Sequence, residues 1–266
     1  MAKLDTLVLR VTDPKAQRRF YRDVLGMSDR GDGRLGYAER EAALRFVAAE
    51  APYAPRPSDL YWKIALSVPN IERACAQLRE RGVLASEPWQ FRDVGYLAKV
   101  TDPEGFTIEL IDHWFQGERP EEAHDETPDE IPDEPHDDTR LGGGAHLSLI
   151  TLRTADIAAV EPEILGWGMT PLSVQPVEPH GFTLYFYAFT EEVPPDPDLE
   201  AIGNRTWVYR RPYSVLEIQH LHALDAETSP SENAAGYVGI TVSPAGSAPA
   251  CPRLRIAAPR PREGAP

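Results

Sequence analysis

One order of strands and helix recurs along this chain, and the repetition limits its fold more than any other feature. In the first copy, an alternating strand at 4–11 precedes a helix that starts at Asp13 and Pro14, and short strands follow up to residue 48. The same order restarts at residue 61, and the turn TDPEG joins its last two strands. The sequence therefore predicts βαβββ units in tandem.

The second half of the chain repeats the unit again. Residues 149–169 (LITLRTADIAAVEPEILGWGM) correspond to residues 6–27, and strands are expected at 182–189 and 205–221. Residues 236–242 (GYVGITV) match the opening strand of the second copy, but proline-rich sequence follows them. We expect an α+β fold of repeated βαβββ modules in which the fourth module is truncated.

Composition divides the chain into two bodies. We expect a first domain of two modules at 1–116 and a second domain, one module plus a fragment, at 143–243. Residues 117–142 are expected to form a disordered acidic linker, because 118–138 contain eleven Asp or Glu, one Arg and few apolar side chains. Residues 244–266, rich in Pro and Arg, are expected to be a loose tail.

Charge and composition exclude several classes of protein. The net charge of −15 disfavours nucleic acid as a partner, because phosphate binding needs a basic face. No apolar run reaches the roughly 18 residues of a membrane span, and the N-terminus lacks a signal-peptide core. The two cysteines are far apart, which argues against a disulfide scaffold and favours a cytoplasmic location. A truncated module would leave a sheet edge unpaired, so we expect a homodimer.

Three stretches carry a family resemblance. VLRVTDPKAQRRFYRDVLGM, YWKIALSVPNIERACAQLRERG and KVTDPEGFTIELID resemble glyoxalase I and the wider vicinal-oxygen-chelate superfamily. The third unit resembles the eukaryotic-type lactoylglutathione lyase in NRTWVYRRPYSVLEIQH. The resemblance implies paired modules that surround a cavity with a divalent metal at its base. In glyoxalase I the metal binds enediolate oxygens while a glutamate moves a proton between adjacent carbons.

The positions that carry metal ligands in this family are largely altered. The resemblance assigns them to Thr6, Arg45, Lys63 and Glu109 in the first two modules, and only Glu109 is a ligand-type residue. Arg45 and Lys63 would repel a divalent ion at close range. A divalent metal is therefore disfavoured as a cofactor at this site.

The third module retains one ligand-type residue. Glu217 fills its family position, Leu149 occupies the other, and His146 lies three residues before Leu149. If the modules pair crosswise, Glu109 and Glu217 line one cavity with Lys63 between them. This arrangement would be either an ion-paired pocket or a distorted metal site.

Two functions remain open from the sequence. In the first, a glyoxalase I-like lyase or isomerase acts on a small carbonyl or enolisable compound, with Glu109 as the base and Lys63 and Arg45 as electrostatic stabilisers. In the second, a non-catalytic protein of the bleomycin-resistance kind binds or sequesters a small molecule between aromatic walls. Lys63 and Glu109 could also form a purely structural ion pair.

Further candidates for binding come from the same motifs. Arg10 and Arg153 match an arginine that in glyoxalase I helps to hold the glutathione carboxylate. The predicted substrate-binding residues are Thr6, Arg10, Arg45 and Arg153, and the predicted aromatic walls are Trp62, Trp89, Phe91 and Tyr96. We expect the histidines, His113 and His146 among them, to be surface or packing residues.

Overall fold

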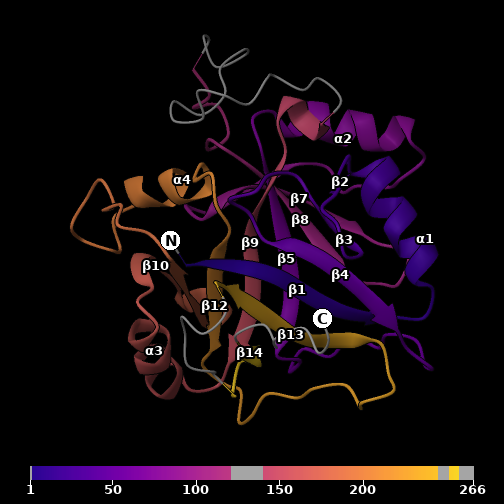
Figure 1. The fold of residues 1–266 in the computed structure, drawn as a ribbon. Coiled ribbons are helices and arrows are strands. Elements are labelled where there is room, and N and C mark those ends of the chain that lie inside the picture. The colour runs from indigo at the N-terminus through magenta and orange to yellow at the C-terminus, as the bar shows by residue number, and fades with distance from the viewer. Residues whose placement is uncertain (1, 121–139, 245–251, 258–266) are drawn as a thin grey trace.

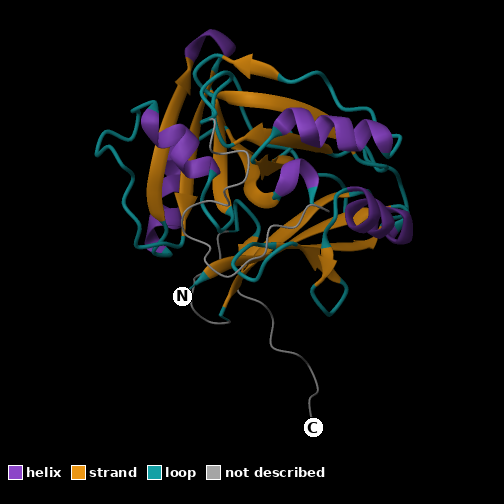
Figure 2. Ribbon diagram, turned by 90° about the horizontal axis from the view of Figure 1, so that it is seen from above, coloured by secondary structure: helices purple, strands orange, loops and turns teal. Residues whose placement is uncertain are grey.

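The strands of the protein form two sheets. The computed structural model describes residues 2–120, 140–244 and 252–257. One sheet has six strands in the order β14-β13-β1-β4-β3-β2, and the other has eight in the order β10-β11-β12-β9-β5-β8-β7-β6. Figure 2 shows the helices around the outside of the strands. This arrangement confirms the α+β fold with βαβββ modules.

The elements follow the predicted repeat. The first module contains β1 (Lys3–Val11), α1 (Pro14–Arg19), the π-helix η1 (Phe20–Val24), β2 (Ser28–Asp29), β3 (Arg34–Gly36) and β4 (Ala43–Ala48). The second contains β5 (Tyr61–Val68), α2 (Ile71–Glu80), β6 (Trp89–Phe91), β7 (Gly95–Thr101) and β8 (Thr107–Asp112). The third contains β9 (His146–Thr154), α3 (Ile157–Gly166), β10 (Thr170–Val177), β11 (Phe182–Ala188), α4 (Gly203–Tyr209) and β12 (Val215–Leu221). Two strands, β13 (Gly236–Ser243) and β14 (Ile256–Ala257), follow the third module in the region predicted as a truncated fourth. Short 3₁₀ turns lie at η3 (Leu141–Gly143) and η4 (Glu178–His180).

The modules pair crosswise between the two halves of the chain. β1 of the first module is antiparallel to β13 of the fourth, and β5 of the second is antiparallel to β9 of the third. In Figure 1, β9 of the second half lies between β12 and β5, and it joins β5 of the first half to the strands of the second. Each sheet therefore takes strands from both predicted bodies, 1–116 and 143–243. The division into two domains remains a prediction about sequence modules.

Local sequence signals explain where the helices begin. The Asp13 side chain accepts hydrogen bonds from the backbone of Lys15 and Ala16 at the start of α1, and Asn70 caps α2 in the same way. Alternate residues of β1, such as Leu7 and Leu9, are fully buried in a core cluster that contains apolar residues of both sheets. The helices thus cover the apolar faces of the strands.

The predicted strand at 205–221 is wrong in its first part. Residues Gly203–Tyr209 form α4, and the strand starts only at Val215. The side chain of Asn204 bonds to the backbone of Asp196 and Asp198, which fixes the loop before the helix. Val208 and Tyr209 are buried against the eight-stranded sheet, so tertiary packing outweighs the β propensity of this segment.

Part of the predicted tail is also ordered. β14 runs parallel to β13 with Ile256 beside Ile240, and the side chains of Leu254 and Ile256 are buried. Residues 252–257 are therefore not loose, because they bury apolar surface on the six-stranded sheet. The rest of the predicted tail from 245 onward, 245–251 and 258–266, lies outside the described residues.

Both ends of the predicted linker pack on the protein, whereas 121–139 lie outside the described residues. Arg119 forms ion pairs with Asp112 and Glu72. Gly142 has a φ of 61°, and a Cβ atom there would lie 2.7 Å from the backbone oxygen of Asn70. Only glycine fits this close approach to the start of α2.

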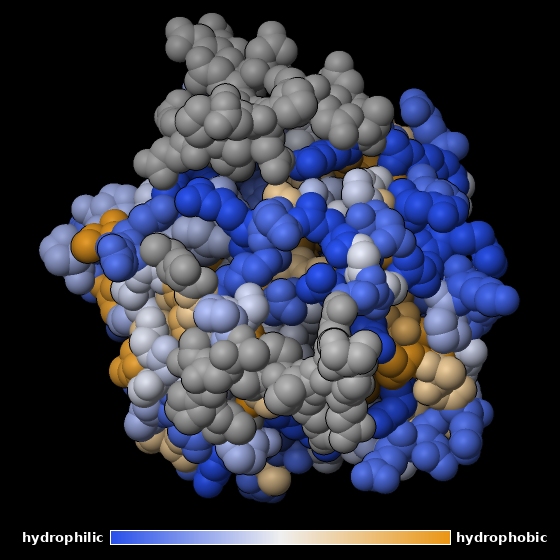
Figure 3. Space-filling model, viewed as in Figure 1, coloured by the Kyte–Doolittle hydropathy of each residue, from blue (hydrophilic) through white to orange (hydrophobic). Residues whose placement is uncertain are grey.

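The surface bears on the predicted partners. On the face drawn in Figure 3, hydrophilic residues predominate among the coloured atoms. Four large hydrophobic side chains are exposed among the described residues, namely Leu84, Leu165, Val193 and Ile202. No helix in the described ranges is long and apolar enough to cross a membrane. The homodimer remains a prediction.

Candidate functional site

Three charged side chains meet in the eight-stranded sheet. Nζ of Lys63 on β5 lies 2.7 Å from Oε1 of Glu109 on β8 and 3.3 Å from Oε2 of Glu217 on β12. The exposed fraction of the side chain is 2% for Lys63, 7% for Glu109 and 2% for Glu217. Thr151 on β9 donates a further hydrogen bond of 3.1 Å to Glu217. We call Lys63, Glu109 and Glu217 the ion cluster.

Strand register brings the ion cluster together. β5 is parallel to β8 with Lys63 beside Thr107, and Glu109 lies two residues further along, on the same face. β5 is antiparallel to β9 with Lys63 opposite Thr151, and Thr151 is paired in turn with Glu217 of β12. The cluster forms because the second and third modules share one sheet, which is the crosswise arrangement.

The members of the cluster depend on one another electrostatically. Burial lowers the pKa of the Lys63 ammonium, but the two carboxylates outweigh this effect and hold that pKa above its usual value. Burial raises the pKa of Glu217, and the attraction of Lys63 opposes the rise. Lys63 is therefore charged at neutral pH and serves as the counter-ion of both carboxylates.

These residues do not fit the divalent metal that the resemblance implies. The Lys63 ammonium contacts both carboxylates, so a cation of the protein itself already occupies the position between them. Its charge would repel a metal ion brought between the two carboxylates. Within 2–120, 140–244 and 252–257, no three His, Cys, Asp or Glu side chains gather in a way that could hold an ion.

Apolar side chains close the sheet face next to the ion cluster. Ile111 of β8 and Leu149 of β9 are buried in a cluster that includes Val208 and Tyr209 of α4. The Tyr209 hydroxyl donates a hydrogen bond of 2.8 Å to the backbone oxygen of Val94. Helix α4 thus fills the part of the sheet face where an open cavity would otherwise lie.

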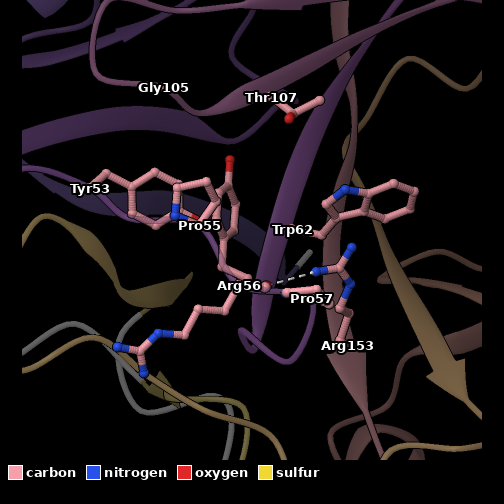
Figure 4. Close-up of a pocket in the computed structure, with 9 residues that line it drawn as sticks. Tyr53, Pro55, Arg56, Pro57, Trp62, Gly105, Thr107 and Arg153 are labelled. Atoms are coloured by element: carbon pink, nitrogen blue, oxygen red, sulfur yellow. Dashed lines mark hydrogen bonds between the residues drawn. The ribbon is translucent and has the colours of Figure 1, made fainter.

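A pocket of about 310 Å³ lies beside the cluster and opens to solvent past exposed residues at its rim. Figure 4 shows the Arg153 guanidinium beside the Trp62 ring and the Tyr53 ring on the opposite side, while the Arg56 side chain extends away from Trp62. Its lining residues are Tyr53, Pro55, Arg56, Pro57, Tyr61, Trp62, Gly105, Thr107 and Arg153.

Cations surround the indole ring of Trp62. The Arg153 guanidinium lies 4.7 Å from the ring centre, Lys63 Nζ 4.9 Å and Lys99 Nζ 5.6 Å. Arg153 is held by a 2.9 Å hydrogen bond to the Gln219 side chain, and burial lowers its pKa without removing its charge. The pocket therefore combines a flat aromatic wall with positive potential.

The pocket and the ion cluster share a wall. Trp62 precedes Lys63 on β5, at a point where the pairing with β9 shifts by one residue. Thr107 lines the pocket and lies two residues before Glu109 on β8. A ligand in the pocket would therefore contact residues that hold Lys63 and Glu109 in place.

Comparison with known proteins finds a family match in the first part of the chain. The sequence model of one protein family, the glyoxalase/bleomycin resistance protein/dioxygenase superfamily, matches residues 3–110. The match covers the first two modules as far as Leu110 in β8. No curated protein has a significant match to the sequence.

Two solved structures resemble the fold over most of the chain. Glyoxalase I from Zea mays superposes with a TM-score of 0.58 at 17% identity, covering 91% of this chain and 74% of that one. A putative dioxygenase from Bacillus subtilis superposes with a TM-score of 0.50 at 14% identity, covering 90% of this chain and 69% of that one. At this level of identity the likeness concerns the fold alone.

The residues predicted as metal-ligand positions or substrate contacts separate into two places. Lys63, Glu109 and Glu217 form the ion cluster, whereas Thr6, Arg10 and Arg45 lie on β1 and β4 of the other sheet. Thr6 donates a hydrogen bond to Asp5, and Arg45 is exposed. These three residues are therefore not part of the ion cluster, which lies in the eight-stranded sheet.

Other predicted residues also have definite positions. Arg153 and Trp62 line the pocket, and the Trp89 ring lies 5.6 Å from Lys99 Nζ. His146, considered as a ligand beside Glu217, instead lies against His113 with ring centres 5.6 Å apart. It is five residues from Thr151 along β9, about 16 Å by strand rise, so it cannot share an ion with Glu217.

Sequence reasoning missed the outer half of the pocket. Tyr53, Arg56 and their proline neighbours lie in the turn before β5, which the sequence marks only as rich in proline. No periodicity places such a turn over a sheet. An aromatic residue and an arginine between prolines were the available signal, because prolines hold a loop in a defined conformation.

Proposed function

We propose that this chain is a small-molecule-binding member of the superfamily and that its pocket takes a planar anionic compound. One observation carries the proposal: the pocket surrounds Trp62 with cations, while Lys63 pairs both nearby carboxylates. A volume of about 310 Å³ suits a compound of one or two rings. This is the binding or sequestering alternative of the sequence interpretation.

The charges favour an anion as the ligand. Arg56, Lys99 and Arg153 contribute three positive charges at or beside the pocket, and the ion cluster adds at most one net negative charge behind its wall. A carboxylate or phosphate can accept hydrogen bonds from a guanidinium group while its ring stacks on Trp62. A neutral ring of the same shape gains only the stacking term.

Binding of 1-naphthoate and phenyl phosphate, followed by quenching of tryptophan fluorescence, tests the proposal. We expect wild-type protein to bind them at least tenfold more tightly than the neutral 1-naphthalenemethanol, because an ionic hydrogen bond is worth about 1.5–3 kcal/mol. Arg153→Gln should abolish this preference, whereas Trp62→Ala should weaken the binding of the anions and of the neutral compound alike. Arg210→Gln is the matched control, since Arg210 stacks on Trp114 at 4.1 Å outside the pocket lining.

Two results would contradict the binding proposal. One is equal affinity for the anion and the neutral isostere. The other is a larger loss of affinity in Glu109→Gln than in Trp62→Ala, because the cluster carboxylate is not expected to contact the ligand.

The enzymatic alternative has one observation in its favour. Glu109 is the most exposed member of the ion cluster, and its 2.7 Å contact with Lys63 pairs a base with a cation next to a pocket. As a glyoxalase I-like lyase or isomerase, the protein would use Glu109 to move a proton of a small enolisable compound, with Lys63 stabilising the enolate. Turnover of the methylglyoxal–glutathione hemithioacetal, lost in a folded Glu109→Gln variant, is the expected result. Retained turnover in that variant would exclude this role.

A further inference from the structure

A second polar group lies buried at the far end of the same strands. The rings of His113 and His146 are 5.6 Å apart, and these residues are only 3% and 8% exposed. Nε2 of each histidine is buried without a hydrogen-bond partner, and so is Oγ of Ser67, a residue with no exposed surface. Three polar atoms thus lack a partner in one region of the core.

Strand register brings these three side chains together as it does the ion cluster. Ser67 of β5 is opposite His146 of β9 and beside Ile111 of β8. His113 follows Ile111 by two residues. His113 therefore has the same register relative to Ser67 as Glu109 has relative to Lys63. The backbone N–H of His113 donates to the oxygen of Val68 at 3.1 Å, which extends this register past the end of β8.

The chemistry of the two rings restricts what can satisfy them. Burial lowers the pKa of His146 to about 4 and that of His113 well below its usual value, so both are neutral at pH 7. Backbone hydrogen bonds at Arg211 and Tyr209 partly oppose the shift of His146. Because Nε2 of His146 has no partner, these carbonyls hold the proton of His146 on Nδ1 and leave the lone pair of its Nε2 free. A neutral His113 can adopt the same tautomer. An anion cannot satisfy a lone pair, whereas a metal ion can.

The charges and the ligand types near the two rings restrict which metal ion could bind there. Arg119 and Arg210 disfavour positive charge at His113, and Arg140 and Arg211 do so at His146. Acidic partners offset part of this charge, since Arg119 pairs with Asp112 and Arg211 with Glu192. Hard dications such as Mg²⁺ prefer oxygen ligands and have no carboxylate among these three side chains. Imidazole nitrogen suits zinc and copper.

We propose that His113, His146 and Ser67 form a binding site for a transition-metal ion of the imidazole-preferring class, Zn²⁺ or Cu⁺. The ring separation fits: with a metal–nitrogen bond of about 2.0–2.1 Å, two rings that share one ion at an angle near 120° have centres roughly 5.5 Å apart. The site is separate from the ion cluster and goes beyond the proposed function. It would supply partners to polar atoms that otherwise have none.

Titration of the metal-free full chain with ZnCl₂, and anaerobically with Cu⁺, tests this site. We expect each wild-type chain to bind one metal ion tightly, with Zn²⁺, with Cu⁺ or with either. His113→Leu and His146→Leu should weaken its binding by about 100-fold or more, because each removes one of two nitrogen ligands. The double variant His220→Ala/His222→Ala is the matched control and should leave this ion bound. Its rings are 5.2 Å apart, but His222 is exposed and its Nε2 contacts Thr183.

X-ray absorption of the wild-type protein loaded with that metal gives a second test that does not depend on a folded variant. Scattering from two imidazole rings is the expected spectrum. The proposal is overturned if neither Zn²⁺ nor Cu⁺ binds stoichiometrically, if the spectrum shows fewer than two imidazoles, or if the His220/His222 variant loses the ion. In each case a buried water molecule would be left as the partner of these atoms.

Discussion

Replacement of Lys63 by methionine tests the energetics of the ion cluster most directly. Methionine keeps much of the apolar volume of the side chain and removes its charge, so Glu109 and Glu217 remain buried without a counter-ion. Removing one partner of a buried ion pair costs about 3–5 kcal/mol. Here one cation serves two carboxylates, so we expect Lys63→Met to lower the free energy of unfolding by roughly 4 kcal/mol at pH 7.5.

This loss should depend on pH with a definite sign. Burial already raises the pKa of Glu217 with Lys63 present, and without Lys63 the folded-state pKa of Glu217 rises further above the unfolded value of about 4.3. The folded variant then takes up protons at a higher pH than its unfolded chain. Its deficit relative to wild type should therefore shrink as the pH falls from 7.5 toward about 4.3 and then level off.

Urea unfolding at several pH values, followed by circular dichroism, measures both effects. Lys99→Met is the matched control, since Lys99 lies opposite Glu109 on β7 but is partly exposed to solvent. It should cost about 0.5 kcal/mol or less. The triple variant Lys63→Met/Glu109→Gln/Glu217→Gln should regain much of the lost stability because no buried charge remains. A loss below about 1 kcal/mol at pH 7.5, or a deficit that grows as the pH falls, would refute the reasoning.

Three further predictions concern other parts of the fold. His146 has a pKa of about 4 in the folded state against about 6.5 in the unfolded chain, so the free energy of unfolding should fall by roughly 3 kcal/mol between pH 6.5 and pH 4. In urea unfolding, a folded His146→Leu variant should lose less stability over this pH range. Gly142→Ala should cost about 1–3 kcal/mol by strain and by contact with Asn70, whereas Gly166→Ala, with open space around it, should not destabilise the protein in thermal melts. Leu254→Ala should cost about 2–5 kcal/mol in urea if β14 packs as described, and an unchanged midpoint would contradict that packing.

The sequence predicts strands and caps well where they follow local rules. Alternation locates β1 and β5, and Asp13 and Asn70 mark the helix starts, because these signals act between neighbouring residues. The contact of Lys63 with Glu217 is predictable only through the repeat, since 154 residues separate the two. Crosswise module pairing had to be assumed before that contact could be expected.

The remaining features depend on packing that no local pattern encodes. Residues 205–209 have strand-forming side chains but become helical because Val208 and Tyr209 fill the sheet face. Leu254 and Ile256 are isolated apolar residues in a proline-rich stretch, and only their position on β13 buries them. The pairing of His113 with His146 likewise requires the register of three strands.

The pairing of β1 with β13 has a consequence for the order in which the chain folds. Lys3 is paired with Ser243, so the six-stranded sheet joins segments separated by 240 residues. All eight strands of the other sheet, in contrast, lie between Tyr61 and Leu221. Closing the longer loop costs more chain entropy and slows folding. During synthesis the N-terminal strand must therefore wait, with one edge unpaired, until nearly the whole chain has left the ribosome, while the eight-stranded sheet with its ion cluster can already be complete.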